Sequence, residues 1–261
     1  MLERLREEVL EANLELVRQG LVLYTFGNVS GIARAERLVV IKPSGVPYEQ
    51  MKPEHLVVTD LEGNLVEGKM RPSSDLPTHL VLYKEFGEIG GVAHTHSEYA
   101  TAWAQARKPI PCFGTTHADY FHGPVPVTSE MTDHEIAADY ERNTGHAIVH
   151  SLQRTTASAT PGVLVANHGP FAWGADAAAA THHAAILEAI ARMAYFTLGI
   201  HSAAQPVGNA LHNKHYLRKH GENAYYGQAT DTHKDKDKDK DKDKDKDKDK
   251  DKDKDKDKDK Q

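Results

Sequence analysis

Residues 90–100, GGVAHTHSEYA, place His94 and His96 two positions apart after an apolar pair. Side chains two positions apart share a face on a β-strand but diverge on a helix. The glycines before the apolar pair and the helical pattern of SEYATAWAQA predict a strand over 91–95 and then a helix over about 97–106. On such a strand both imidazoles face one point. In a chain with 17 histidines, however, this tripeptide is equally compatible with hydrogen-bonded or exposed rings.

The rest of the chain alternates irregularly between helical and extended patterns. Apolar residues recur at helical spacing from Leu2 to Val17, and Gly20 supplies a stop signal. Caps and periodicity predict further helices, and β-branched runs predict strands. The expected helices lie at about 75–86, 131–152, 176–200 and 209–221, and the strands at 37–42, 55–60, after LEGN, and in PGVLVANHGPFAWG before a glycine-flanked loop. This pattern predicts an α/β sandwich without fixing the strand order.

Composition excludes several classes of function. The formal net charge is −6 and no basic stripe is present, which argues against nucleic acid as a partner. The first 20 residues carry charges throughout their apolar spacing, so we expect neither a signal peptide nor a membrane span there. The single cysteine, Cys112, allows no intramolecular disulfide and favours the cytoplasm, and its neighbours PIPCFG predict a buried thiol.

The end of the chain differs sharply from the rest. Residues 234–260 alternate Lys and Asp without an apolar side chain, so burial cannot offset the entropy cost of ordering them. We therefore expect one domain over residues 1–228 and a disordered tail over residues 229–261 that is not part of the fold.

Two further residues extend the histidine pair into a candidate metal site. His168, in VANHGPF, stands where an apolar run meets a glycine, and Asp75, in RPSSD, stands just before a predicted helix. Three imidazoles and one carboxylate are a ligand set suited to zinc. Each residue also has a simpler interpretation, because Asp75 is a common helix N-cap type and His168 is able to hydrogen-bond its own loop.

Many dispersed stretches resemble one family. GNVS, VIKPSGV, PSSDLPTH, VAHTHS, GTTHADYF, MTDHEI, PGVLVANHGPFAWG and KHYLRKHG…AYYGQ, between about Leu2 and Gln228, are similar to the L-ribulose-5-phosphate 4-epimerases of the class II aldolase and adducin-head superfamily. The resemblance implies a class II aldolase-like three-layer α/β/α sandwich around a central, mostly antiparallel sheet.

The resemblance also implies the roles of individual residues. It assigns a Zn²⁺ ion, or another divalent cation, to Asp75, His94, His96 and His168. It assigns the substrate phosphate to a set of small and cationic residues: Gly27, Asn28, Lys42, Ser44, Gly45, Ser73, Ser74 and Arg218. Glycine and serine loops at a helix N-terminus are suited to an anion, although PSG and PSS by themselves are ordinary turns.

The implied reaction inverts carbon 4 of a 2-ketopentose 5-phosphate, a sugar-phosphate substrate. The acid/base groups implied for it are Asp119 and Tyr226, contributed by a neighbouring subunit of a fourfold-symmetric homotetramer. Without the resemblance, Asp119 is a loop acid and Tyr226 a core aromatic. Thr115 and His215 are expected near the same site, with no defined role.

Two other functions remain open from the sequence. An aldolase of the L-fuculose 1-phosphate type resembles the chain in its histidines but tends to carry Glu where Asp75 stands. A non-catalytic module like the adducin head shares the fold but lacks the metal ligands, all of which are present here. Neither the physiological metal nor the pathway that supplies the substrate, arabinose or ascorbate utilisation, follows from the sequence.

Overall fold

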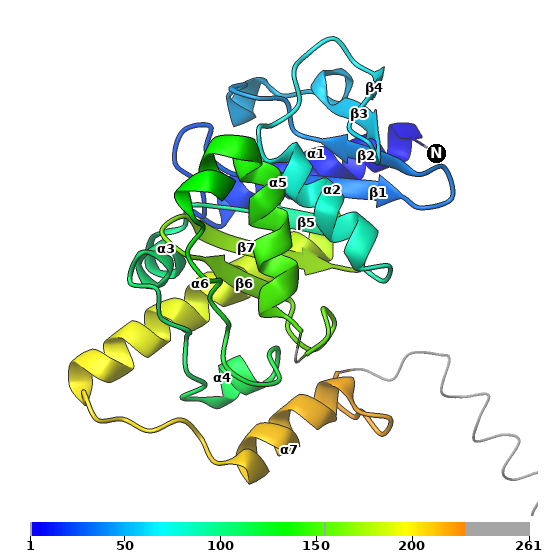
Figure 1. Cartoon of the computed structure of the whole chain (residues 1–261). Coiled ribbons are helices and arrows are strands. Elements are labelled where there is room, and N and C mark those ends of the chain that lie inside the picture. The colour runs from blue at the N-terminus through cyan, green and yellow to red at the C-terminus, as the bar shows by residue number, and fades with distance from the viewer. Residues whose placement is uncertain (1, 154, 228–261) are drawn as a thin grey trace, which may run out of the picture. The chain divides into compact units, whose positions relative to one another are not determined.

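The computed structural model describes residues 2–153 and 155–227, and their centre is one antiparallel sheet (Figure 1). Among these residues the sheet has seven strands, in the order β4-β3-β2-β1-β5-β7-β6. Every pair of neighbouring strands is antiparallel. The strands are β1 Asn28–Ala33, β2 Leu38–Ile41, β3 Val57–Asp60, β4 Leu65–Glu67, β5 Gly91–His94, β6 Gly162–Val165 and β7 Gly169–Gly174. The strand that ends at His94 therefore lies inside the sheet, between β1 and β7.

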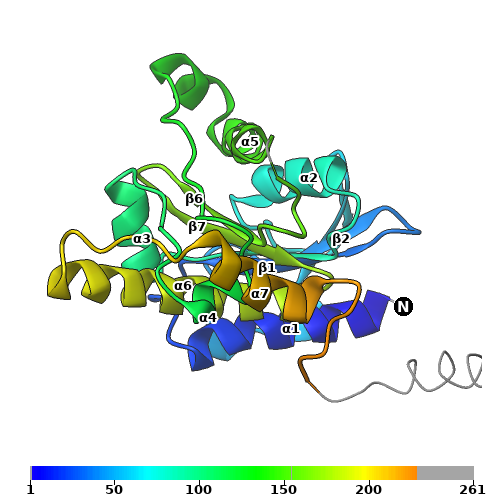
Figure 2. The ribbon, with the colours of Figure 1, turned by 90° about the horizontal axis from the view of Figure 1, so that it is seen from below.

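Helices cover both faces of this sheet, which gives the expected three layers. Figure 2 shows α1 and α6 on one face and α2 and α5 on the other. The helices are α1 Leu2–Arg18, α2 Leu76–Glu85, α3 Glu98–Gln105, α4 Thr115–Ala118, α5 Asp133–Ser151, α6 Ala177–Ile200 and α7 Asn209–His220, with 3-10 turns η1 Tyr48–Gln50 and η2 Pro53–His55. The helices expected from periodicity and caps are confirmed, and the strand expected at 55–60 begins only after η2.

Both faces of the sheet are apolar because successive side chains of a strand point to opposite faces. In β2, Val39 and Ile41 pack in one core with residues of α2, whereas Val40 packs in the other core with residues of α1 and α6. In β5, Val92 and Ala93 divide in the same way. Strands such as β2 therefore contain continuous apolar runs, which made them recognisable in the sequence.

Two strands have no such run and were not expected. β1 reads NVSGIA, and a Cβ atom at Gly31 would lie 2.9 Å from Cγ2 of Val9 on α1, so the small residue permits close packing of helix on sheet. β7 reads GPFAWG and pairs with β6 as a hairpin, where the sequence predicted a single strand and a loop. Glycine and proline have low β-propensity, so the sequence pattern did not reveal either strand. Both strands form because neighbouring strands pair with them.

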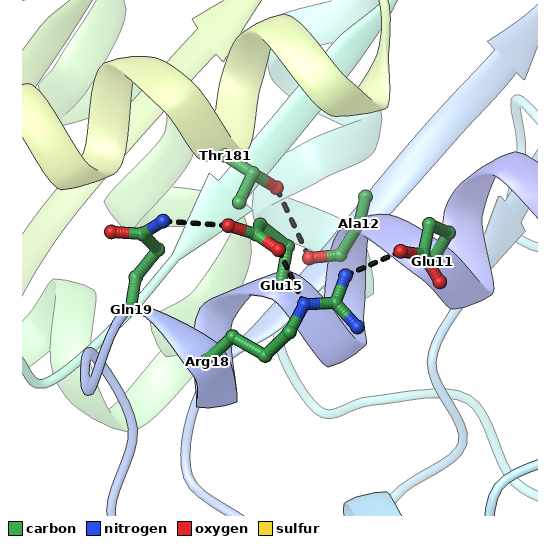
Figure 3. A network of polar contacts seen from close by, with 6 residues as sticks. All are labelled: Glu11, Ala12, Glu15, Arg18, Gln19 and Thr181. Atoms are coloured by element: carbon green, nitrogen blue, oxygen red, sulfur yellow. Dashed lines mark hydrogen bonds and ion pairs between the residues drawn. The ribbon is translucent and has the colours of Figure 1, made fainter.

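One buried amide connects α1 to the sheet. Asn13 is fully buried; its Nδ2 donates to the carbonyl oxygens of Val9 at 2.7 Å and Val29 at 3.0 Å, and its Oδ1 accepts from the Val29 N–H at 2.9 Å. Figure 3 shows the neighbouring contact of α1 with α6, where Thr181 Oγ1 donates to the carbonyl of Ala12 at 3.3 Å. The ion pairs of Arg18 with Glu11 and Glu15 lie on the exposed side of the helix.

The described residues divide into two units, one that ends at Tyr216 and one that begins at Leu217. The expected domain boundary near residue 228 stays a prediction, and the expected tail over 229–261 lies outside the described residues. Within the described part of the chain no helix has the length and apolar character needed to cross a bilayer. Cys112 is buried, as its neighbours predicted.

Replacing Asn13 with Leu is expected to lower the free energy of unfolding by about 1–3 kcal/mol, because the Val29 N–H and two carbonyls lose a buried partner. Chemical denaturation of both proteins measures the loss. The matched control is Gln19→Leu, which removes an exposed amide bonded to Glu15 at the end of the same helix and should change stability little. Equal stability of the Asn13 variant and the parent would contradict the assignment.

Candidate metal centre and anion pocket

Three histidines at or just beyond the ends of strands converge in the structure. His94 ends β5, His96 follows in the connection to α3, and His168 stands in the turn between β6 and β7. Each offers a ring nitrogen, and the three nitrogens lie within 4.8 Å of one another. The ring centroids are 4.7 to 5.0 Å apart. The β-hairpin turn that carries His168 contains Asn167 at φ 61°, a left-handed conformation that asparagine tolerates better than most residues.

His94 is buried, His168 is half-buried and His96 is exposed, and hydrogen bonding and desolvation favour the neutral, ligand-ready form of the rings. The Nδ1 of His94 donates to the carbonyl oxygen of Pro170 at 2.9 Å, since a carbonyl only accepts, and this leaves its Nε2 with a lone pair. That Nε2 lies 3.1 Å from Nε2 of His96. Burial lowers the pKa of His96 and lowers the pKa of His168 to about 3. Facing nitrogens of this kind fit a divalent cation as their common partner.

Asp75 lies beside this cluster but is not one of the three grouped ligands. It precedes α2, yet its side chain makes no capping hydrogen bond, so the interpretation of Asp75 as a simple N-cap is wrong. Instead, Asn28 Nδ2 donates to its Oδ2 at 2.6 Å. Burial opposes ionisation of the carboxyl, but His94 and the Asn28 hydrogen bond hold its pKa below the ordinary value. Asp75 is therefore a carboxylate available to the pocket.

The histidines open onto a cavity of about 360 Å³ that has anion-binding features. Its walls contain Thr25, Phe26, Gly27, Asn28, Lys42, Pro43, Ser44, Gly45, Ser73, Ser74, Asp75, His94, His96, Tyr140, Glu141 and His168. All the predicted phosphate residues of the first unit are among them. Gly27 and Gly45 have φ values of 87° and 68°, so glycine permits both turns. A Cβ atom on Gly27 would lie 2.9 Å from the carbonyl oxygen of His94.

Lys42 is a buried cation in this cavity. The residue is 2% exposed, and its Nζ lies 3.4 Å and 3.3 Å from the carbonyls of Thr25 and Pro43 and 4.8 Å from the ring centroid of Tyr48. Burial lowers the pKa of Lys42 to about 8. A bound anion would favour the charged ammonium, which is the arrangement expected at a phosphate site.

Residues 7–195 match the model of the class II aldolase and adducin N-terminal domain. The chain belongs to this family. Over 227 residues it is 53% identical to the L-ribulose-5-phosphate 4-epimerase UlaF of Salmonella paratyphi B, which covers 87% of this chain and all of the relative, and 52% identical over the same shares to the UlaF protein of Salmonella typhi. An enzyme named as L-fuculose 1-phosphate aldolase resembles its structure with a TM-score of 0.71 at 26% identity, over 82% of this chain and 95% of the other.

The solved relatives confirm the class II aldolase fold that the sequence predicted. An L-fuculose-1-phosphate aldolase from Thermus thermophilus has a TM-score of 0.62 at 24% identity, over 78% of this chain and all of the other, and this likeness concerns the fold alone. The fold brings together the three histidines of this class II aldolase family member and the glycine and serine loops that line the same cavity.

The predicted acid/base residues do not all lie with the histidines. Asp119, just after α4, is buried and its Oδ1 accepts from His215 Nδ1 at 3.0 Å. Neither Asp119 nor Thr115 lines the cavity. Within one copy of the class II aldolase unit, the carboxylate predicted to act in catalysis is therefore absent from the cavity that holds the histidines.

Arg218 and Tyr226 belong to the second unit, where they contact each other. The Arg218 guanidinium lies 4.8 Å from the ring centroid of Tyr226, and the Lys219 ammonium lies 4.5 Å from it. Tyr226 is 60% exposed, so its interpretation as a core aromatic is wrong. Its exposure is compatible with a role toward a ligand or a neighbouring chain.

Tyr140 and Glu141 line the cavity but were not predicted as site residues. The capping box of Thr132 and Glu135 that starts α5 is confirmed. However, the helix is interrupted at Asp139, whose φ of −156° and ψ of 78° are not helical. The sequence DYER contains no glycine or proline to signal this kink, so the local pattern predicted an uninterrupted helix.

Replacing Lys42 with Met is expected to stabilise the fold at pH 7, on the order of 1–3 kcal/mol, because the buried ammonium is penalised while its folded pKa of about 8 lies below its unfolded value. That penalty is fully present below pH 8 and fades as the lysine loses its proton between the folded and unfolded pKa values. The stability difference between the two proteins should therefore shrink as pH rises from 7 to 10.

Thermal melts of both proteins across this pH range measure the effect. The same substitution should weaken the binding of inorganic phosphate. Lys42→Met is therefore expected to change the stability of the fold and its affinity for phosphate in opposite directions. A stability difference that is constant with pH would contradict the assignment.

Proposed function

We propose that this member of the class II aldolase family is a metal-dependent L-ribulose-5-phosphate 4-epimerase that forms D-xylulose 5-phosphate. The observation that carries the proposal is that one cavity is lined both by three histidines and by glycine and serine loops suited to a phosphate. Support also comes from relatives of that name, which are matched over their whole length at 53% and 52% identity. We further propose that the enzyme acts in the cytoplasm.

The chemistry of the substrate explains why such a cavity is needed. The hydrogen on carbon 4 is not alpha to the ketone, so direct deprotonation gives a carbanion without resonance stabilisation. Breaking the bond between carbons 3 and 4 instead gives the enediolate of dihydroxyacetone and glycolaldehyde phosphate. Rotation of the aldehyde, followed by addition to its other face, inverts carbon 4. The protein must therefore hold both fragments while the aldehyde turns.

In this proposal the two ends of the cavity hold the two fragments. His94, His96 and His168, with Asp75, would hold Zn²⁺ or another divalent cation, which supplies Lewis acidity toward the oxygens of the ketose end. The N–H and hydroxyl groups of the loops around Gly27, Ser44 and Ser73 donate hydrogen bonds to the phosphate, and Lys42 supplies a positive charge. We also assign Asn28, Gly45, Ser74 and Arg218 to phosphate binding. Anchoring the phosphate permits the aldehyde to turn without leaving.

The carbon 4 hydroxyl lies on opposite sides in substrate and product, so two acid/base groups are required. We assign them to Asp119 and Tyr226 of a neighbouring copy in a homotetramer. The proposal agrees with the cavity of one copy, whose walls lack Asp119. The hydrogen bond from His215 orients the Asp119 carboxylate and gives His215 a positioning role.

Incubation with L-ribulose 5-phosphate, with and without a chelator, tests the reaction. We expect D-xylulose 5-phosphate to form with little free glycolaldehyde phosphate, and we expect a chelator to abolish its formation. Accumulation of free aldehyde would instead identify an aldolase, as the structural similarity to an L-fuculose 1-phosphate aldolase allows. No turnover and no stoichiometric divalent ion would favour a binding module like the adducin head.

A mixture of two inactive variants tests the shared site. His96→Ala removes a metal ligand, and Asp119→Asn removes the acid/base group, so each protein alone should be inactive. In co-expressed mixed tetramers, about a quarter of the sites pair an intact His96 with an intact Asp119 from a neighbour. We therefore expect activity near a quarter of the parent level. If both residues act within one chain, the mixture stays inactive, and the assignment to a neighbouring copy is wrong.

A further inference from the structure

The interruption of α5 brings a tyrosine into the cavity. Residues 132–139 are exposed, and the non-helical Asp139 separates them from the following part of the helix. Tyr140 comes immediately after this break, is partly buried and lines the cavity with the three histidines. A kink without glycine or proline needs tertiary interactions to maintain it.

Several contacts maintain the backbone around Tyr140. Arg142 Nε donates to Oδ2 of Asp139 at 2.8 Å, and Thr144 Oγ1 donates to the carbonyl of Tyr140 at 2.8 Å. From the neighbouring helix α2, the buried Thr78 donates its hydroxyl to the carbonyl of Glu141 at 2.5 Å. The backbone on both sides of Tyr140 is therefore held, which limits where its side chain can lie.

The hydroxyl of Tyr140 contacts a histidine of the metal centre. It lies 3.3 Å from Nδ1 of His168, and the two ring centroids are 6.0 Å apart. The equivalent nitrogen of His94 is held by the carbonyl of Pro170 at 2.9 Å. Histidine ligands usually donate their second ring nitrogen to such an outer partner, which selects the tautomer and orients the ring.

We propose that Tyr140 is a positioning residue of the metal centre, whose hydroxyl accepts the Nδ1–H of His168 and thereby leaves Nε2 of His168 free to bind the cation. This inference rests on the metal site proposed above. The proposed role of Tyr140 also explains the kink at Asp139, because residue 140 of a continuous helix would point in a different direction.

The electrostatic surroundings of Tyr140 are compatible with this role. Burial and the carboxylates of Asp75 and Glu141 raise its pKa, so the hydroxyl keeps its proton at neutral pH. A neutral hydroxyl accepts from His168 without adding a charge to the site.

The test uses the full chain, freed of metal, and Zn²⁺ alone as the probe. In Tyr140→Phe the hydroxyl is lost but the ring stays, and we expect the Zn²⁺ dissociation constant to rise about 10- to 100-fold in competition with a chromophoric chelator. At saturating Zn²⁺ the turnover of L-ribulose 5-phosphate should return close to the parent level. The matched control is Tyr120→Phe, which removes a hydroxyl 3.1 Å from Nε2 of His182, outside the cavity, and should leave Zn²⁺ affinity unchanged.

Other outcomes separate this inference from the proposed function. Zn²⁺ binding that is equally tight in the parent and in Tyr140→Phe overturns the positioning role. Unchanged affinity with a loss of turnover at saturating Zn²⁺ also overturns it, because Tyr140 would then act on the substrate. Failure of the parent protein to bind Zn²⁺ overturns the zinc site itself, whatever the variant does.

A second measurement needs no variant and therefore does not depend on the folding of Tyr140→Phe. Nitrogen-15 NMR of the metal-free parent protein reports which ring nitrogen of His168 carries the proton. We expect Nδ1 to be protonated and Nε2 to be free. A proton on Nε2 with Nδ1 free would overturn the inference, because Tyr140 would then be donating to His168 rather than accepting from it.

Discussion

The candidate site depends on the convergence of three imidazoles at the ends of strands in the antiparallel sheet. Nitrogens with lone pairs that face one another at 3.1 Å repel unless a proton or a cation lies between them. Burial lowers the pKa of His96 and His168, which favours neutral rings, and the hydrogen of one neutral ring can join only two of the three nitrogens. A divalent cation satisfies all three rings at once. The position of β5 between β1 and β7 makes this convergence possible, because His94 pairs with Asn28 on one side and Phe171 on the other.

The same strands also bring the anion loops to the metal centre. Asn28 pairs with His94 across β1 and β5, and its side chain donates to both Ser73 and Asp75 at the start of α2. The segments that we propose to hold the two ends of a sugar phosphate are therefore connected through one buried amide. Small residues permit this connection, since a side chain at Gly27 would meet the carbonyl of His94. A change in one part of the cavity is expected to affect the other.

The cavity of one copy contains the groups that we propose for both ends of a substrate, but its walls lack Asp119. Asp119 is buried and forms a hydrogen bond with the half-buried His215 elsewhere in the same unit. In the homotetramer that we propose, one copy binds the substrate and its neighbour supplies the proton transfers. Assembly would then be a requirement for epimerisation, whereas binding of metal and phosphate would belong to each copy. Retaining the aldehyde fragment would likewise depend on the neighbouring chain.

The sequence by itself determined the elements that local patterns encode. Helical periodicity specified α1 and α6, the Thr132–Glu135 capping box specified the start of α5, and apolar β-branched runs specified β2 and β3. The spacing of His94 and His96 at the end of an apolar run indicated a shared target, and resemblance to known epimerases supplied the remaining site residues. These signals survive in the sequence because the interactions that produce them lie within a few residues.

Only the tertiary structure decided the features that depend on distant neighbours. The strands β1 and β7 contain glycine or proline and form because adjacent strands pair with them. Asp75 stands at an N-cap position, yet Asn28, far away in the chain, holds its carboxylate toward the cavity. The Tyr140 hydroxyl contacts His168 after a kink in α5 that the local sequence does not signal. The hydrogen bond from Thr78 of α2 helps to hold the backbone there. Long-range pairing and packing outweigh local propensity at these positions, which is why the sequence alone did not reveal them.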